Sequence, residues 1–156
     1  MTATNTADKL WFLDMLVHIH VAGDANDDGL SVIENVAPQG FSPPLHIHHG
    51  EDEIFHMLAG EARFLVDGKE MRAGAGDTLV APKGRPHTFL VTSAGGARWL
   101  TLTGRGDFER MVRTAGRPAQ KDELPPRVGH PSQEQTVALA AICRENRIEL
   151  IGPPLA

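Results

Sequence analysis

The chain is poor in cysteine and in long apolar segments. Cys143 is the only cysteine among 156 residues, which excludes an internal disulfide. It ends the apolar run Ala-Leu-Ala-Ala-Ile-Cys, where buried packing is a more common role than nucleophilic catalysis. No apolar segment is long enough to span a bilayer, and the first nine residues lack both the basic and the apolar parts of a signal peptide. These absences favour a cytoplasmic protein with no membrane partner.

The sequence also lacks an excess of basic residues. Fifteen Lys and Arg stand against twenty Asp and Glu, and the net charge of −5 argues against a nucleic-acid partner. Neither end carries a helix-turn-helix pattern, which argues against a transcription regulator. With 41% apolar and 22% charged residues, the composition is that of an ordinary globular protein, and the length favours one domain over residues 1–156.

Short apolar runs separated by turn residues dominate the chain up to Gly104. The sequence has sixteen glycines and eleven prolines, a pattern typical of a sandwich or barrel of many short strands. Asp67-Gly68 between two apolar runs predicts a hairpin turn. We therefore expect an all-β barrel core over about residues 10–104, with strands at 10–21, 30–36, 44–49, 53–59, 61–66, 69–72, 78–81, 87–92 and 97–103.

After Gly104 the composition changes. Residues 107–114 predict a short helix within an irregular stretch, 105–131, that is rich in arginine, proline and glycine. Ser132 and Gln135 then form a capping-box pattern ahead of an apolar helix that Asn146 would end. We expect this extension, 105–156, to pack over the outside or one end of the barrel.

Four residues have the spacing of a metal site. Side chains alternate between the two faces of a strand, so His46 and His48 project from the same face and can bind one ion together. A hairpin turn at residues 50–52 would bring Glu53 across from them, and His87 follows a second turn. Three imidazoles and one carboxylate suit Fe, Ni, Mn, Co, Cu or Zn and leave coordination positions open for water, substrate or oxygen.

Neighbouring histidines fit this site less well. The same alternation points His49 and His56 away from the ion. His18 and His20 repeat the two-residue spacing but lack a following glutamate, so we expect them to lie on a strand face at an interface or pocket mouth and not to act as ligands.

Two segments carry a family resemblance. Residues 40–60 fit Gly-x5-His-x-His-x4-Glu-x6-Gly, and residues 76–87 fit Gly-x5-Pro-x-Gly-x2-His. These resemble the two cupin motifs, which implies a double-stranded β-helix, or jelly-roll, barrel holding one divalent transition metal. Only the final asparagine of the second motif is missing, because Val91 stands in its place. The matched positions are Gly40, His46, His48, Glu53, Gly60, Gly76, Pro82, Gly84 and His87.

Weaker motifs resemble bacterial quercetinase-like single-domain cupins. They include Trp11-Phe12-Leu13, Pro43-Pro44, Glu51-Asp52-Glu53, Gly106-Asp107-Phe108 and Gly152-Pro153-Pro154. The resemblance implies a dioxygenase and a homodimer. With the open metal site, we expect the substrate to be a flavonol or another enolisable, oxygen-rich aromatic compound.

The chemistry expected of this site follows from its neighbours. Because side chains alternate along a strand, Phe55 and Met57 lie on the same face as Glu53, and Phe89 and Val91 lie on the same face as His87. We therefore predict that these four residues form the substrate pocket. Coordination would lower the pKa of a substrate hydroxyl. Glu53, if desolvated, would have a raised pKa and could accept that proton as the catalytic base.

Two alternatives to a dioxygenase remain open. The same site could polarise a carbonyl for isomerisation, cyclisation or decarboxylation without consuming oxygen. It could also bind a small molecule without turnover, because one barrel fold hosts many functions.

Overall fold

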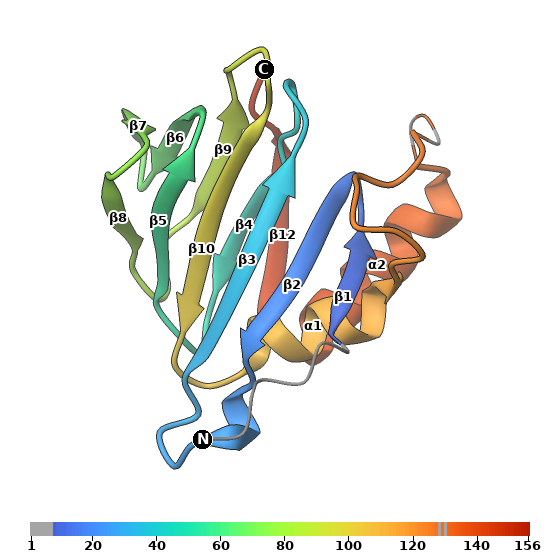
Figure 1. The fold of residues 1–156 in the computed structure, drawn as a ribbon. Helices are drawn as coiled ribbons and strands as arrows, with labels where there is room; N and C mark the ends of the chain where they lie inside the picture. The colour runs from blue at the N-terminus through green and yellow to red at the C-terminus, as the bar shows by residue number, and fades with distance from the viewer. Residues whose placement is uncertain (1–7, 128, 130) are drawn as a thin grey trace.

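Two antiparallel sheets face each other in the computed structural model, which describes residues 8–127, 129 and 131–156 (Figure 1). The seven-stranded sheet has the order β11 (Arg117–Pro118), β1 (Lys9–Phe12), β2 (Met15–Val21), β3 (Ser31–Ala37), β10 (Ala97–Thr103), β5 (Glu53–Ala59) and β8 (Thr78–Ala81). The five-stranded sheet has the order β12 (Ile148–Pro154), β4 (Pro44–His48), β9 (His87–Val91), β6 (Glu61–Val66) and β7 (Lys69–Gly74). The expected all-β jelly roll is confirmed.

Alternating apolar residues explain the strands. Along β3, β5 and β6 every second side chain is buried between the sheets. Ile33, Phe55 and Phe64 are 2% exposed or less, and burying each such side chain stabilises the fold by about 1.5–3 kcal/mol. The core is therefore the space between the two sheets.

The predicted hairpin at Asp67-Gly68 joins β6 and β7. Both residues have positive φ, 51° and 76°, as a two-residue type I′ turn requires. Glycine adopts this conformation without the strain that a Cβ atom brings.

The long strand expected at 10–21 is wrong, because it is two strands. β1 and β2 form a hairpin around Leu13 and Asp14, and Leu13 has a φ of 53°. A left-handed leucine is uncommon, so the apolar pattern concealed the turn.

The expected end of the barrel near Gly104 is also wrong. Residues 148–154 do not merely pack with the last helix but form β12, which pairs with β4 at the edge of the five-stranded sheet. Proline is tolerated there because an edge strand has one side without ladder hydrogen bonds. The pairing register shifts between Leu150 and Gly152 and again between Gly152 and Pro154.

Both predicted helices are present, as α1 (Asp107–Ala115) and α2 (Gln133–Glu145). The capping box is confirmed: the Ser132 hydroxyl accepts from Gln135 N at 3.1 Å, and Ser132 N donates to the Gln135 side chain at 2.8 Å. Asn146 is the C-terminal cap.

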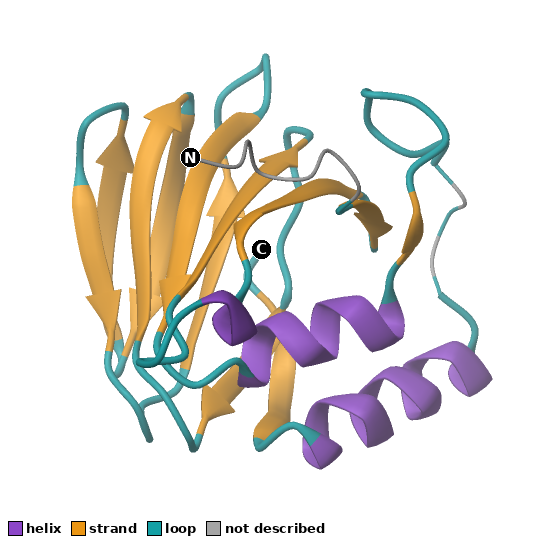
Figure 2. Cartoon of the chain, turned by 60° about the horizontal axis from the view of Figure 1, so that its bottom comes forward, coloured by secondary structure: helices purple, strands orange, loops and turns teal. Residues whose placement is uncertain are grey.

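The two helices contact each other and lie together on one side of the sandwich (Figure 2). There α1 packs against β1 of the seven-stranded sheet, and α2 packs against β12 of the five-stranded sheet. Phe108, Met111 and Val112 of α1 and Cys143 of α2 are buried in the core. Cys143 is 3% exposed within this core, which confirms its packing role, and burial raises the pKa of its thiol to about 11. None of the helices described is long and apolar enough to cross a membrane.

Candidate metal centre

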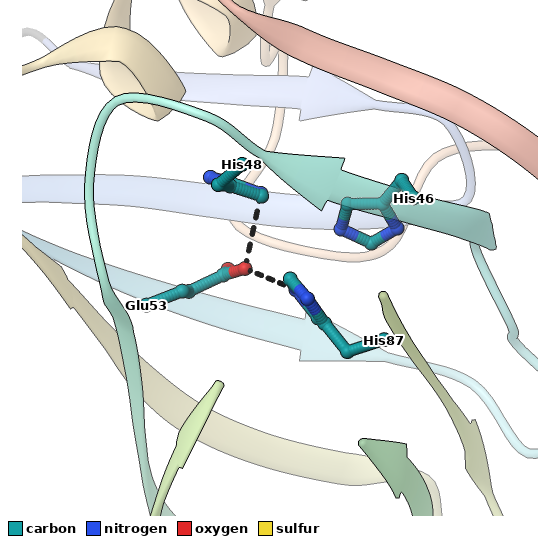
Figure 3. A group of neighbouring side chains, drawn as sticks. All are labelled: His46, His48, Glu53 and His87. Atoms are coloured by element: carbon teal, nitrogen blue, oxygen red, sulfur yellow. Dashed lines mark hydrogen bonds and ion pairs between the residues drawn. The ribbon is translucent and has the colours of Figure 1, made fainter. Parts of the chain in front are cut away.

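The four predicted ligands meet between the sheets (Figure 3). β4 carries His46 and His48, β5 begins at Glu53, and β9 begins at His87, which pairs with His46 across the sheet. The hairpin expected to bring Glu53 across from the histidines is wrong, because β4 and β5 belong to different sheets and the turn at residues 50–52 crosses from one sheet to the other. One donor atom from each residue lies within 4.8 Å of those from the others. The cluster can hold a metal ion.

The centre is almost closed to solvent. His48 and His87 are each 1% exposed and Glu53 is 3% exposed, whereas His46 is partly exposed. Water is thus excluded from three of the four side chains, which strengthens any electrostatic interaction among them.

Backbone carbonyls orient two of the imidazoles. His46 Nδ1 donates to Pro44 O at 2.7 Å and His87 Nδ1 donates to Arg85 O at 3.3 Å. A proton on Nδ1 leaves the lone pair on Nε2, the arrangement that protein metal ligands usually show.

His48 and Glu53 provide a further test of the metal interpretation. Neither ring nitrogen of buried His48 has a hydrogen-bond partner within the described chain, a loss of about 1–3 kcal/mol for each buried polar atom left without one. Glu53 Oε2 lies 2.9 Å from His87 Nε2 and 3.2 Å from His48 Nε2. A divalent ion would bind Glu53 and one nitrogen of each ring, including one of the two unpartnered nitrogens of His48, so the residues fit a metal.

The charge state of the ligands also suits a metal. Burial, together with neighbouring His87 and His48, lowers the pKa of His46 to about 3, and burial lowers the pKa of His48 as well. Both rings are therefore neutral near pH 7 and can donate a lone pair.

The raised pKa expected for Glu53 is wrong. Burial does raise it, but the neighbouring rings of His48, His87 and His46 outweigh burial and lower the pKa to about 2. Glu53 is therefore an ionised ligand candidate and a weaker base than the sequence suggested.

Backbone hydrogen bonds fix the loop between His48 and Glu53. Buried Glu51 accepts from the backbone nitrogens of Arg105 at 2.9 Å and Phe108 at 2.7 Å, at the start of α1. Asp52 Oδ1 accepts from Lys83 N at 2.8 Å, in the turn that precedes His87. The two ligand-bearing loops and α1 thus hold one another in place.

Gly50 lets α1 approach this loop. A Cβ atom there would lie 2.0 Å from Asp107 Oδ2, and Asp107 is buried and paired with Arg147 at 2.9 Å. Any larger residue would displace the helix or break the ion pair.

An apolar cavity of about 60 Å³ opens beside the cluster. His46, His48 and Glu53 line it, as do Phe55 and Phe89 from the predicted pocket. Met57 and Val91 do not line it, because they lie two residues further along their strands, where core side chains fill the interior. The alternation of side chains along a strand correctly predicted that both point between the sheets. It could not predict how far along the strand the cavity extends. The wall is completed by Phe12, Leu13, Met15, Asn35, Phe41, Pro43, Pro44, Trp99, Thr101, Phe108, Met111, Leu139, Cys143, Ile148 and Leu150.

Asn35 and Trp99 are the polar wall residues that sequence reasoning missed. Asn35, 1% exposed, donates from Nδ2 to Thr101 Oγ1 at 3.0 Å, while its Oδ1 has no partner among the described residues. Trp99 Nε1 is buried without a partner as well. The signal in the sequence that could have identified Asn35 is a polar residue at an inward-facing position of a strand.

The excluded histidines do point away. His49 Nε2 lies 2.8 Å from Glu149 Oε2 at the surface, and His56 Nδ1 lies 2.8 Å from the Thr78 hydroxyl. His18 and His20 lie on the outer face of the seven-stranded sheet and form a separate group with Glu34.

Comparison with known proteins adds family information. Residues 32–103, slightly less than half of the chain, match the family model described as "Cupin domain". All four candidate ligands lie inside that segment, whereas the hairpin of β1 and β2, both helices and β12 lie outside it.

Two curated relatives match parts of the chain. A dimethylsulfoniopropionate lyase, DddQ, from Ruegeria pomeroyi is 41% identical over 66 residues, which cover 42% of this chain and 32% of that protein. An oxalate-binding protein from Thermotoga maritima is 41% identical over 52 residues, 33% of this chain and 43% of that protein. The chain thus spans less than half the length of these relatives.

Solved structures share the fold. The polyketide cyclase RemF from Streptomyces resistomycificus aligns over 86% of this chain and 89% of its own, with 19% identity and a TM-score of 0.56. A predicted oxalate decarboxylase from Thermotoga maritima covers 64% of this chain and 91% of its own, with 24% identity and a TM-score of 0.57. These likenesses establish the fold and do not single out a quercetinase.

Proposed function

We propose that this chain, which has the cupin fold, is a metal-dependent enzyme acting on an apolar, enolisable substrate, with a dioxygenase acting on a flavonol-like compound as the leading form. One observation carries the proposal: a three-histidine, one-glutamate donor set borders a cavity whose wall is almost entirely apolar. An oxygen-rich aromatic ring suits such a wall, because only its coordinating oxygens need a polar partner.

His46, His48, Glu53 and His87 would hold one divalent transition metal per chain. When bound, such an ion supplies Lewis acidity that lowers the pKa of a substrate hydroxyl and, if it is redox-active, a path for electrons to dioxygen.

The protein's own residues would bind and orient the substrate. Phe55, Phe89 and Phe41 offer ring faces and exclude water. Asn35 Oδ1 can accept a hydrogen bond and Trp99 Nε1 can donate one, so a substrate with one hydroxyl and one carbonyl on its far edge would satisfy both.

Glu53 remains the proposed proton acceptor. Its carboxylate is ionised and borders the cavity, so it can take a proton from a substrate hydroxyl.

Two observations favour a second candidate, a redox-silent lyase, cyclase, isomerase or decarboxylase. The cavity of about 60 Å³ holds a few water molecules and is smaller than a flavonol, which would need α1 and α2 to shift. In addition, one relative bears the name of a lyase. A third candidate, a binding protein without turnover, has the oxalate-binding relative in its favour.

An oxygen-uptake assay separates these functions. Protein purified without added metal is first analysed for metal content and then assayed with flavonols, enediols, dimethylsulfoniopropionate and oxalate, in air and without oxygen. Oxygen consumption coupled to product supports the dioxygenase. Equal product formation without oxygen supports the redox-silent enzyme, and tight binding without product contradicts both enzymatic candidates.

Three further expectations stay predictions as well: a small-molecule substrate, a cytoplasmic location and a homodimer. Size-exclusion chromatography with light scattering tests the dimer, and a monomer would contradict it.

A further inference from the structure

A second group of metal-ligand side chains lies on the outer face of the seven-stranded sheet. His18 and His20 project from β2 on the same side, and Glu34 on β3 is the register partner of His18. This face is opposite to the one that carries Glu53 of β5, so the group is separate from the first centre.

The three side chains already converge. One donor atom of each lies within 4.8 Å of the others, and His20 Nε2 lies 2.7 Å from Glu34 Oε2. The rings of His18 and His20 have centroids 4.0 Å apart. Small rotations of three partly exposed side chains would bring their donor atoms to the distances that a bound ion needs.

Of the two flanking cations, Lys9 pairs with a residue outside the cluster, whereas Arg98 pairs with the proposed ligand Glu34. Lys9, opposite His18 on β1, pairs with Asp122 at 2.6 Å, and Arg98 pairs with Glu34 at 3.2 Å.

We propose that His18, His20 and Glu34 form a second binding site for a divalent transition-metal ion such as Zn²⁺. Two imidazoles and one carboxylate are a ligand set for this class of ion, and the remaining coordination positions face solvent. The ion would link β2 to β3 and stabilise the hairpin that they form, because it binds the folded arrangement and not the unfolded chain.

The competing interpretation is a surface ion-pair network of His20, Glu34 and Arg98 without a metal. The two interpretations differ in how replacing Arg98 should change the affinity for Zn²⁺. In the metal site Arg98 competes with the ion for Glu34, so Arg98→Met should tighten Zn²⁺ binding by about 3- to 10-fold.

Zinc titration of the metal-stripped full chain by calorimetry, with elemental analysis after dialysis, tests the proposal. We expect two ions per chain in the unaltered protein and one in His20→Ala, whose side chain is 37% exposed and therefore replaceable without loss of folding. His56→Ala is the matched control, because His56 lies on the same outer face but outside the cluster, and it should keep two ions.

The double variant His46→Ala, His87→Ala separates the two centres. It should retain the second ion with a Kd below about 10 μM, and adding His18→Ala should remove it. An unchanged zinc stoichiometry in His20→Ala, or a second Kd weaker than about 100 μM, would overturn the second site and leave the first one standing. If the double variant does not fold, the loss of one of two ions in His20→Ala decides the question alone.

Discussion

Asn35 and Trp99 lie directly opposite each other on β3 and β10, both line the cavity, and each has one buried polar atom without a partner among the described residues. The amide oxygen is an acceptor and the indole N–H is a donor. Under the proposed function, a substrate with one hydroxyl and one carbonyl group would supply the partners that these two atoms lack.

Replacing the amide tests this relationship. Asn35→Leu has a similar shape and removes the acceptor, so we expect the KM of a hydroxylated substrate to rise about 3- to 10-fold, as the loss of one hydrogen bond implies. The free energy of unfolding should not fall much, since a buried oxygen without a partner is removed too. Thr101→Val, which removes the hydroxyl that supports Asn35, should have a smaller effect. An unchanged KM in Asn35→Leu would contradict the binding role.

The first centre predicts the metal content of its variants. His46→Ala or His87→Ala should lower bound metal at least about 10-fold at a fixed free concentration, because each removes a ligand. Elemental analysis measures this. His49→Ala serves as the control, because His49 pairs with Glu149 at the surface. Equal metal in all three variants would refute the ligand assignment.

Glu53→Gln separates binding from proton transfer. The amide keeps an oxygen ligand but cannot accept the proton, so bound metal should fall less than in the histidine variants while kcat drops by roughly 10²–10⁴. Steady-state kinetics on metal-matched samples provide the readout. Full turnover would eliminate Glu53 as the proton acceptor.

Acid should destabilise the metal-free protein from pH 6.5 downward. The pKa of His46 is about 3 in the folded chain against an ordinary value of 6.5, so the unfolded chain takes up the proton first as the pH falls. Each such proton costs up to about 1.4 kcal/mol per pH unit. Glu53, with a pKa of about 2 against 4.5, adds its loss only below pH 4.5.

Urea unfolding of the metal-free chain at pH 6.5 and at pH 4.5 measures this slope. His46→Gln should flatten it, whereas His49→Ala, at an exposed position, should not. Equal slopes in the unaltered protein and in His46→Gln would show that His46 is not the group responsible.

Gly50→Ala should lower the free energy of unfolding by about 1–3 kcal/mol, because the added methyl group would overlap Asp107 Oδ2. Gly95→Ala is the matched control, because no heavy atom lies within 4 Å of an added Cβ there. Thermal unfolding of both variants measures the difference. Equal stability of the two variants would mean that α1 does not need this close approach.

Strand periodicity predicted the sandwich well where alternation was regular. The expected bounds 53–59, 61–66, 78–81 and 97–103 are those of β5, β6, β8 and β10. The turn at Leu13 and the strand at 148–154 escaped prediction, because a leucine there adopts a glycine-like φ and because Gly152 and two prolines usually interrupt a strand.

The candidate site divides in the same way. The shared face of His46 and His48 follows from their two-residue spacing alone. Glu53 was expected to reach them through a hairpin, whereas it reaches them from the opposite sheet, an arrangement that local turn signals cannot predict. Glu34 could not be paired with His18 without the register of β2 against β3. Phe108 and Met111 could not be placed at the cavity without knowing where α1 packs.

The pairing of β12 with β4 has a consequence for biosynthesis. A nascent chain that has reached residue 104 already contains all four ligands, yet the strand that carries His46 and His48 still lacks its outer neighbour, which begins at Ile148. Contacts between such distant segments form late because loop closure opposes them. We therefore expect the four ligands to be held only loosely in the nascent chain. Stable metal binding should follow the synthesis of α2 and β12.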